Sequence, residues 1–101
     1  MHNNKKLFLV HCGFYDKEIL EGIYESHVNF FVVAEDLQQA RSKAKEHPEF
    51  KRKRMHIDGM QQLDAIDGFR ITVERDESLS EPTSIQNYSY RELSNKPIPT
   101  A

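Results

Sequence analysis

Two apolar stretches in the first third of the chain have the pattern of β-strands. The first, LFLVH at residues 7–11, is a short run of strand-forming residues typical of a buried strand. The second, SHVNFFVVAE at residues 26–35, alternates between two faces. One face is wholly apolar and should meet the core: Val28, Phe30, Val32 and Ala34. The other face is mixed and should be partly exposed: His27, Asn29, Phe31 and Val33.

The segment DLQQARSKAKEH, residues 36–47, predicts the main helix. Asp36 can cap its N-terminus, and Gln39 stands at the capping-box spacing. A narrow apolar stripe is formed by Leu37, Ala40 and Ala44. Pro48 should end the helix, because the residue before a proline is driven out of the helical region. Between the two strands, residues 12–25 predict a long loop with at most one short helical turn.

Three shorter strands are expected after the helix, near Met55, at residues 61–66 and at residues 69–74. Asp67 and Gly68 predict a tight hairpin turn between the last two, since an Asp-Gly pair tolerates positive φ. Beyond Arg75 the chain becomes polar and carries three prolines. This composition predicts a largely disordered tail with a short docking segment at residues 85–90.

The order strand, strand, helix, strand, strand, strand predicts an α+β fold. Residues 1–75 should form one domain, a small, mainly antiparallel sheet with one main helix packed on one face, and residues 76–101 a flexible tail. One helix leaves the other face of the sheet uncovered. Phe31 and Val33 on that face favour a cover by the tail or by a second subunit, and we expect a homodimer.

Composition narrows the classes of partner. Charged residues make up 30% of the chain, yet the net charge is only −2, so there is no overall attraction to nucleic acid or to anionic membranes. The single cysteine, Cys12, cannot form an internal disulfide. The N-terminus lacks the apolar length of a signal peptide or membrane span. We therefore expect a cytoplasmic protein that does not bind membranes.

Three stretches resemble a known family. LFLVHCG, ESHVNFFVVAED and MHIDGMQQLDAIDGFRI, within residues 7–75, are similar to a small bacterial family of uncharacterised proteins, domain of unknown function 1543. The shared features are Glu25-x-His27, His56-Ile57-Asp58 and the aromatic residue after Asp67-Gly68.

The first strand departs from the family pattern, which is richer in glycine after that strand. This chain has only Gly13 there and a longer loop, so no loop-borne role is implied. The resemblance implies no activity either, because the family has none assigned. Members carry one or two copies of the domain per chain, which agrees with a dimer here.

Four polar residues form the main candidate site. Glu25 and His27 are two residues apart and share a strand face, as do His56 and Asp58. If the strands were neighbours, two histidines and two carboxylates could converge as ligands of zinc or iron, or as an acid–base pair. The alternative is an ordinary polar network at a sheet edge. Compact metal motifs such as HExxH and CxxC are absent from the sequence.

Two other patterns suggest weaker sites. A calcium loop at Asp58, Gln62, Asp64 and Asp67 is interrupted by apolar residues and lacks a closing Glu. We therefore interpret Asp67-Gly68 as a hairpin turn and Asp58-Gly59 as the end of a strand. Cys12 is interpreted as a small core residue rather than a nucleophile.

Basic residues are concentrated between the main helix and the third strand. Seven of the fourteen basic residues lie there: Arg41, Lys43, Lys45, Lys51, Arg52, Lys53 and Arg54. Such a patch could hold phosphates of a nucleic acid. It could equally be a solvated helix face and a positive loop that keeps an edge strand from pairing with other chains. No nucleic-acid-binding motif accompanies it, so we do not expect nucleic acid as the partner.

The sequence thus favours a non-enzymatic binding or assembly domain that acts as a homodimer and needs no cofactor. The first alternative is a divalent-metal or acid–base site at Glu25, His27, His56 and Asp58. The second is weak nucleic-acid binding through residues 41–54. The first alternative requires the four side chains to lie within a few ångströms of one point.

Overall fold

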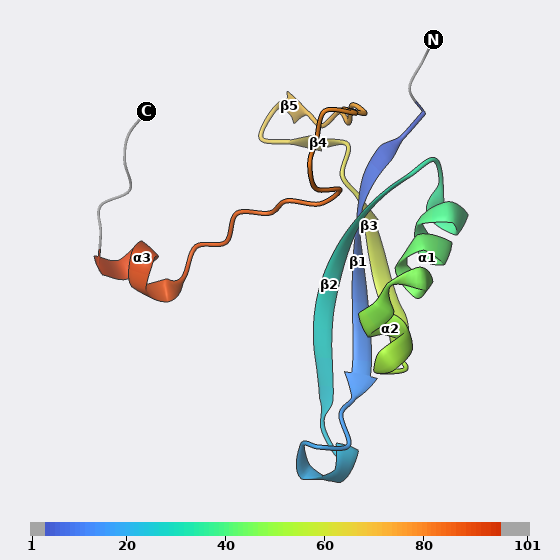
Figure 1. Cartoon of the computed structure of the whole chain (residues 1–101), viewed down its shortest axis with the longest axis vertical. Helices are drawn as coiled ribbons and strands as arrows, with labels where there is room; N and C mark the ends of the chain where they lie inside the picture. The colour runs from blue at the N-terminus through green and yellow to red at the C-terminus, as the bar shows by residue number, and fades with distance from the viewer. Residues whose placement is uncertain (1–3, 96–101) are drawn as a thin grey trace.

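The computed structural model describes residues 4–95, and its centre is a three-stranded antiparallel sheet. The strands are β1 (Lys6–Tyr15), β2 (Glu25–Ala34) and β3 (His56–Gln62), with β1 in the middle. Helices α1 (Leu37–Glu46) and α2 (Pro48–Arg52) lie on one side of this sheet (Figure 1). The architecture is the expected α+β fold, with one face of the sheet covered by helix.

The core lies between the sheet and the helices α1 and α2. Phe8, Val10 and Cys12 of β1 are fully buried, and fully burying a side chain such as Phe8 stabilises the fold by about 1.5–3 kcal/mol. Ala40 and Ala44 are buried on α1, where their small size lets the helix approach the sheet closely. The predicted inward face of β2 is confirmed. Its residues are partly or fully buried, and they alternate with exposed residues on the outward face. Leu37 was expected in the apolar stripe but is 58% exposed.

Local hydrogen bonds fix the ends of α1. The Asp36 carboxylate accepts a hydrogen bond from the Gln39 backbone N–H at 2.7 Å, which confirms the predicted N-cap. The Gln39 side chain in turn accepts from the Glu35 N–H at 2.8 Å. At the other end Pro48 does end α1, but the chain then re-enters a helix. Proline is favourable at the first position of a helix, so α2 begins at Pro48, and this second helix was not expected from the sequence.

Strand β1 is longer than its apolar run suggests. Residues 12–15 were expected to begin a loop, but β1 continues to Tyr15, which pairs with Glu25 at the far end of β2. The central strand is hydrogen-bonded on both sides, and this pairing outweighs the low strand propensity of Gly13. The true loop spans residues 16–24 and contains the short 3-10 helix η1 (Leu20–Gly22).

Strand β3 continues through the Asp58-Gly59 step, which was expected to end a strand. His11 of β1 pairs with Gly59 while the next residue, Cys12, pairs with Ile57, so Asp58 is the extra residue of a β-bulge. The bulge shifts the alternation of faces by one residue. Ile57 and Met60 both pack against the core although they are three positions apart, a spacing that puts residues on opposite faces of a regular strand.

The last strands form a separate hairpin. Asp67 and Gly68, with φ of 54° and 85°, link β4 (Ala65–Ile66) to β5 (Phe69–Arg70) as the expected turn. This pair makes its own two-stranded sheet. The strand expected at residues 61–66 is divided, because residues 61–62 end β3 of the main sheet and only residues 65–66 form β4. Of the strand expected at residues 69–74, only residues 69–70 are a strand.

The described part of the tail holds one short helix that no pattern predicted, α3 (Tyr90–Asn95). Its neighbours in the expected docking segment are exposed, Ile85 at 54% and Tyr88 at 71%. Residues 96–101 of the tail lie outside the described residues.

Candidate metal centre

The face of the main sheet that the helices leave uncovered, here called the open face, changes character along the strands. Toward the start of β1 its cross-strand pairs are apolar, Leu7 with Val33 and Leu9 with Phe31. Toward the end of β1 they are polar, His11 with Asn29, Gly13 with His27 and Tyr15 with Glu25. We call the first part the apolar half and the second, together with His56 and Asp58 of β3, the polar half.

A glycine stands at the centre of the polar half. Gly13 on the middle strand pairs with His27 on one side and with His56 on the other. A Cβ atom at Gly13 would overlap Glu25 Oε1 and would lie 2.7 Å from both Asp58 Oδ2 and His56 Nε2. The missing side chain therefore provides the space into which the neighbouring polar groups extend.

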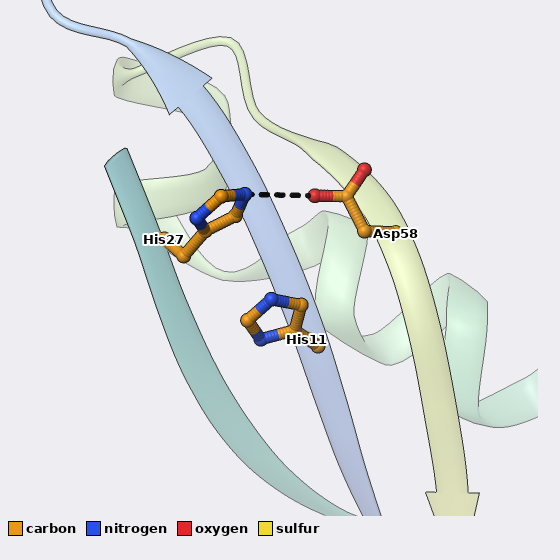
Figure 2. Close-up of side chains that lie close together, drawn as sticks. All are labelled: His11, His27 and Asp58. Carbon is orange, nitrogen blue, oxygen red and sulfur yellow. Dashed lines mark ion pairs between the residues drawn. The ribbon is translucent and has the colours of Figure 1, made fainter. Parts of the chain in front are cut away.

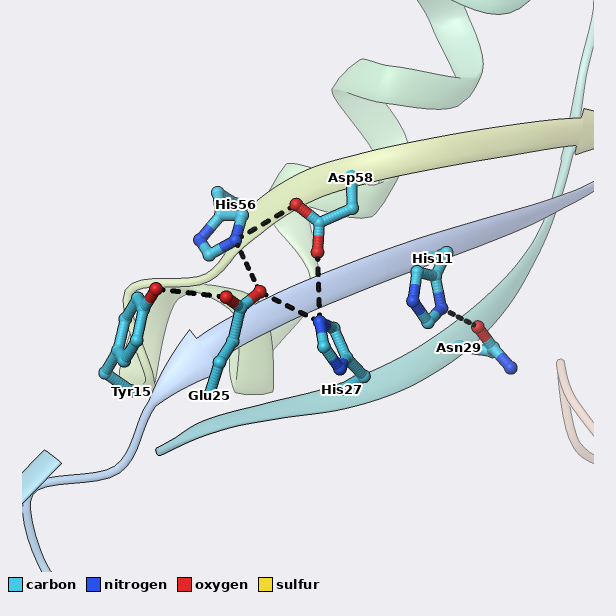
Figure 3. A network of polar contacts seen from close by, with 7 residues as sticks. All are labelled: His11, Tyr15, Glu25, His27, Asn29, His56 and Asp58. Atoms are coloured by element: carbon cyan, nitrogen blue, oxygen red, sulfur yellow. Dashed lines mark hydrogen bonds and ion pairs between the residues drawn. The ribbon is translucent and has the colours of Figure 1, made fainter. Parts of the chain in front are cut away.

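The candidate residues of β2 and β3 meet above this glycine, although the two strands are not neighbours. Their backbones flank β1 and so lie about 9–10 Å apart, twice the usual strand spacing. The side chains of Glu25, His27, His56 and Asp58 cross this gap and converge, as Figure 3 shows. We call these four residues the histidine–carboxylate cluster.

Nitrogen and oxygen atoms alternate within the cluster. His27 Nε2 lies 2.8 Å from Glu25 Oε1 and 3.3 Å from Asp58 Oδ2. His56 Nε2 lies 3.1 Å from the same Glu25 oxygen and 3.1 Å from Asp58 Oδ1. Each imidazole therefore contacts both carboxylates, and Asp58 uses a different oxygen for each histidine.

A tyrosine outside the cluster holds Glu25 in place. The Tyr15 hydroxyl donates a hydrogen bond to Glu25 Oε2 at 3.0 Å. This bond is the main reason why the pKa of Glu25 is below its ordinary value, with smaller contributions from His56 and His27. Reciprocally, the carboxylate raises the pKa of Tyr15. Glu25 is therefore an ionised acceptor at neutral pH.

A third histidine, His11, joins the site without having been expected there. Its Nδ1 lies 2.7 Å from Asn29 Oδ1, and its ring stacks on that of His27 with 4.9 Å between centroids. Figure 2 shows it beside His27 and Asp58, and ligand atoms of these three residues lie within 4.8 Å of one another. Its place in a strand was visible in the sequence, but only the β1–β2 register brings it beside His27.

The donor atoms suit a transition-metal ion. Imidazole nitrogen with carboxylate oxygen is a ligand set of zinc and of iron. Two ligands of one tetrahedral zinc ion, each bonded at about 2.0–2.2 Å, lie about 3.3–3.5 Å apart. The contacts of 2.8–3.3 Å within the cluster are close to that separation. Side-chain exposure runs from 28% for Glu25 to 46% for His56, so solution ions can reach the cluster.

The basic residues of the candidate patch make several different contacts. On α1, Arg41 and Lys45 are four residues apart and share a side, whereas Lys43 lies on another side and donates a hydrogen bond to the Val33 carbonyl. Arg52 pairs with Glu49 through two contacts of 2.6 Å and 3.1 Å, and Lys53 lies over the ring of Phe14 at 4.5 Å. The candidate basic residues that follow α1 are Lys51, Arg52, Lys53 and Arg54, and the last three line a pocket that also contains Asp16 and Glu18.

The remaining candidates are separate from the cluster. Cys12 is buried on the helix side of β1, and burial, with the nearby Asp58 charge, raises the pKa of its thiol, as expected for a core residue. Within residues 4–95, no close group of three metal-ligating side chains includes Asp64 or Asp67. The same stretch of chain holds no helix with the length and apolar character needed to cross a membrane.

The comparisons with known proteins give a family but no activity. No curated protein matches the chain, and no solved structure matches it. A family model described as Domain of Unknown Function (DUF1543) matches residues 22–73, just over half of the 101 residues. All four residues of the histidine–carboxylate cluster lie inside that segment, while β1 lies outside it. On this match, the chain belongs to the DUF1543 family.

Proposed function

We propose that this protein binds a divalent transition-metal ion, such as zinc, in the histidine–carboxylate cluster. The observation that carries the proposal is the convergence of four ligand side chains over Gly13, with nitrogen–oxygen contacts of 2.8–3.3 Å. Glu25, His56 and Asp58 form the central triad, because their ligand atoms lie within 4.8 Å of one another. His27 completes the set when a single ion is bound.

Proton and charge balance supports a metal over a purely hydrogen-bonded network. Each Nε2 contacts two carboxylate oxygens, but a neutral imidazole has only one hydrogen on that atom to share between them. A divalent ion replaces the two hydrogens by direct bonds to all the ligand atoms. It also neutralises the two carboxylates, one of which, Glu25, is already held in its ionised form.

The open position of the site favours exchangeable binding. The cluster lies on the uncovered face of the sheet, and its histidines are each 46% exposed. Catalytic zinc sites keep a ligand position accessible to water, whereas structural zinc sites are closed. We therefore expect an ion that chelators remove without unfolding the protein.

Metal titration of tag-free, metal-free protein by calorimetry tests the proposal. We expect zinc to bind, and His56→Ala to weaken binding by more than about tenfold because a direct ligand is lost. His47→Asn is the matched control, since His47 lies outside the cluster and asparagine keeps an acceptor for the capping bond to Glu49. Absence of binding to the wild type, or equal affinity in His56→Ala with an unchanged circular dichroism spectrum, would contradict the proposal.

For the assembly role expected from the sequence, we propose a second copy of the chain as the partner and the apolar half as the contact. The supporting observation is the exposure of large apolar side chains there, 50% for Phe31 and 39% for Val33, beside the partly buried Leu7 and Leu9. A stable contact needs about 1,000 Å² of buried surface in total. Light scattering during gel filtration, at micromolar protein, tests this by giving the oligomer mass.

A further inference from the structure

Asp58 presents its two oxygens to different partners. Oδ1 lies 3.1 Å from His56 Nε2, and Oδ2 lies 3.3 Å from His27 Nε2. The bulge in β3 makes Asp58 the extra residue, which has no paired residue on β1. A carboxylate with its oxygens divided in this way can bridge two metal ions, one on each oxygen.

Two groups of ligands meet at Asp58. One consists of Glu25, His56 and Asp58, and the other of His11, His27 and Asp58. Within each group the ligand atoms lie within 4.8 Å of one another, and Asp58 is the member they share. The first group links β2 to β3, and the second spans all three strands of the main sheet.

The environment of His11 prepares it to bind a metal. The Asn29 amide oxygen can only accept a hydrogen bond, so the hydrogen of a neutral His11 ring stands on Nδ1, 2.7 Å away. Nε2 is then left with a free lone pair. A fixed acceptor on the second ring nitrogen is the usual way in which proteins orient metal-binding histidines.

From these contacts we propose that the polar half holds two divalent transition-metal ions bridged by Asp58. The first is bound by Glu25, His56 and Asp58 Oδ1, and the second by His11, His27 and Asp58 Oδ2. The two-ion proposal rests on the proposed function. It adds that His27 binds the second ion, and not the first, when both ions are present. The two ions would lie about 3.5–4 Å apart, as in known two-metal sites.

The second ion changes the contact between the two stacked rings. At present the His11 and His27 rings are nearly parallel, 19° apart. Parallel rings cannot aim both lone pairs at one point, so the rings must turn about their side-chain bonds when an ion binds. The second ion is therefore the weaker of the two.

Cobalt(II) titration of the metal-free full chain, followed by native mass spectrometry and visible absorbance, tests the pair. We expect two ions per wild-type chain in two separable steps, and one ion in His11→Ala, whose first step keeps its affinity within about threefold. Asn29→Ala should weaken only the second step, while Asn29→Asp, which keeps an acceptor for His11 Nδ1, should retain it. Circular dichroism checks the fold of each variant.

Each outcome is decisive. One ion per wild-type chain at saturation overturns the two-ion proposal and leaves the proposed function standing. No bound ion overturns the two-ion proposal and the proposed function together. Two ions in both the wild type and His11→Ala would mean that the second ion binds elsewhere, and this result also overturns the two-ion proposal. An Asn29→Ala variant with an unchanged second step would remove the positioning role of Asn29.

Discussion

The open face of the main sheet carries two surfaces of opposite chemistry on the same strands. In the apolar half, Leu9 pairs with Phe31; four residues further along β1, Gly13 pairs with His27. The antiparallel pairing of β1 with β2 is uninterrupted through both halves, so between these two strands the difference arises from the side chains. One sheet can therefore carry an apolar contact surface and a metal-binding site side by side.

The two halves should respond to different conditions. Binding through the apolar half depends on the area removed from water and changes little with pH. Binding in the polar half depends on ionised carboxylates and on histidines without a proton, so it weakens in acid. Substitutions that affect one half and not the other would test this division.

The largest expected effect is that of Gly13→Ala on the polar half. The new Cβ would overlap Glu25 Oε1 and crowd Asp58 and His56, so several ligands must move at once. We expect metal affinity to fall by more than about 100-fold, since even a change behind one ligand costs about 10- to 100-fold. Calorimetric titration measures this.

The matched control for that substitution is Gly59→Ala on the adjacent strand. A Cβ there meets nothing within 4 Å, so metal affinity should stay near that of the wild type. Equal affinities for the Gly13 and Gly59 variants would show that the space above Gly13 is not needed. The apolar half should be unaffected by either, with the same oligomer mass.

The next effect in size is that of Phe31→Ser on the apolar half. Removing a half-exposed phenyl ring from a dimer contact should raise the dimer dissociation constant by about 10- to 100-fold, the equivalent of about 1.5–3 kcal/mol. Analytical ultracentrifugation over a range of concentrations measures it. Leu37→Ser, an exposed apolar position on α1, serves as the control and should leave the constant unchanged.

A monomeric wild type at all concentrations would refute the dimer. If Phe31→Ser weakened metal binding as strongly as dimerisation, the two halves would not be independent.

The smallest effect is that of Tyr15→Phe, which removes the hydroxyl bonded to Glu25. The pKa of Glu25 is lowered in the folded protein, so its contribution to stability is present above its unfolded pKa and is lost as pH falls through the folded pKa. Without the hydroxyl the folded pKa rises toward its ordinary value, and this loss begins at higher pH. Metal affinity should fall by about tenfold.

Carbon-13 NMR of the Glu25 carboxyl group measures its pKa directly in the wild type and in Tyr15→Phe. Tyr88→Phe, an exposed tyrosine of the tail, is the control. An unchanged Glu25 pKa in Tyr15→Phe would mean that the histidines, and not the tyrosine, set its ionisation.

The sequence by itself determined those features that depend on neighbours along the chain. Alternation identified the inward face of β2, the Asp36 cap fixed the start of α1, and Asp67-Gly68 gave the hairpin turn. It also showed that Glu25 shares a face with His27, because side-chain direction in a strand follows a period of two. Each of these rests on local geometry, which needs no partner strand.

Only the tertiary structure decided what lies across from each strand. The length of β1, the bulge at Asp58 and the place of His11 follow from hydrogen bonds between distant segments, which no local pattern contains. The cluster itself depends on this. Glu25 and His56 lie on strands separated by β1. Their side chains meet because the register places Gly13, which has no side chain, between them.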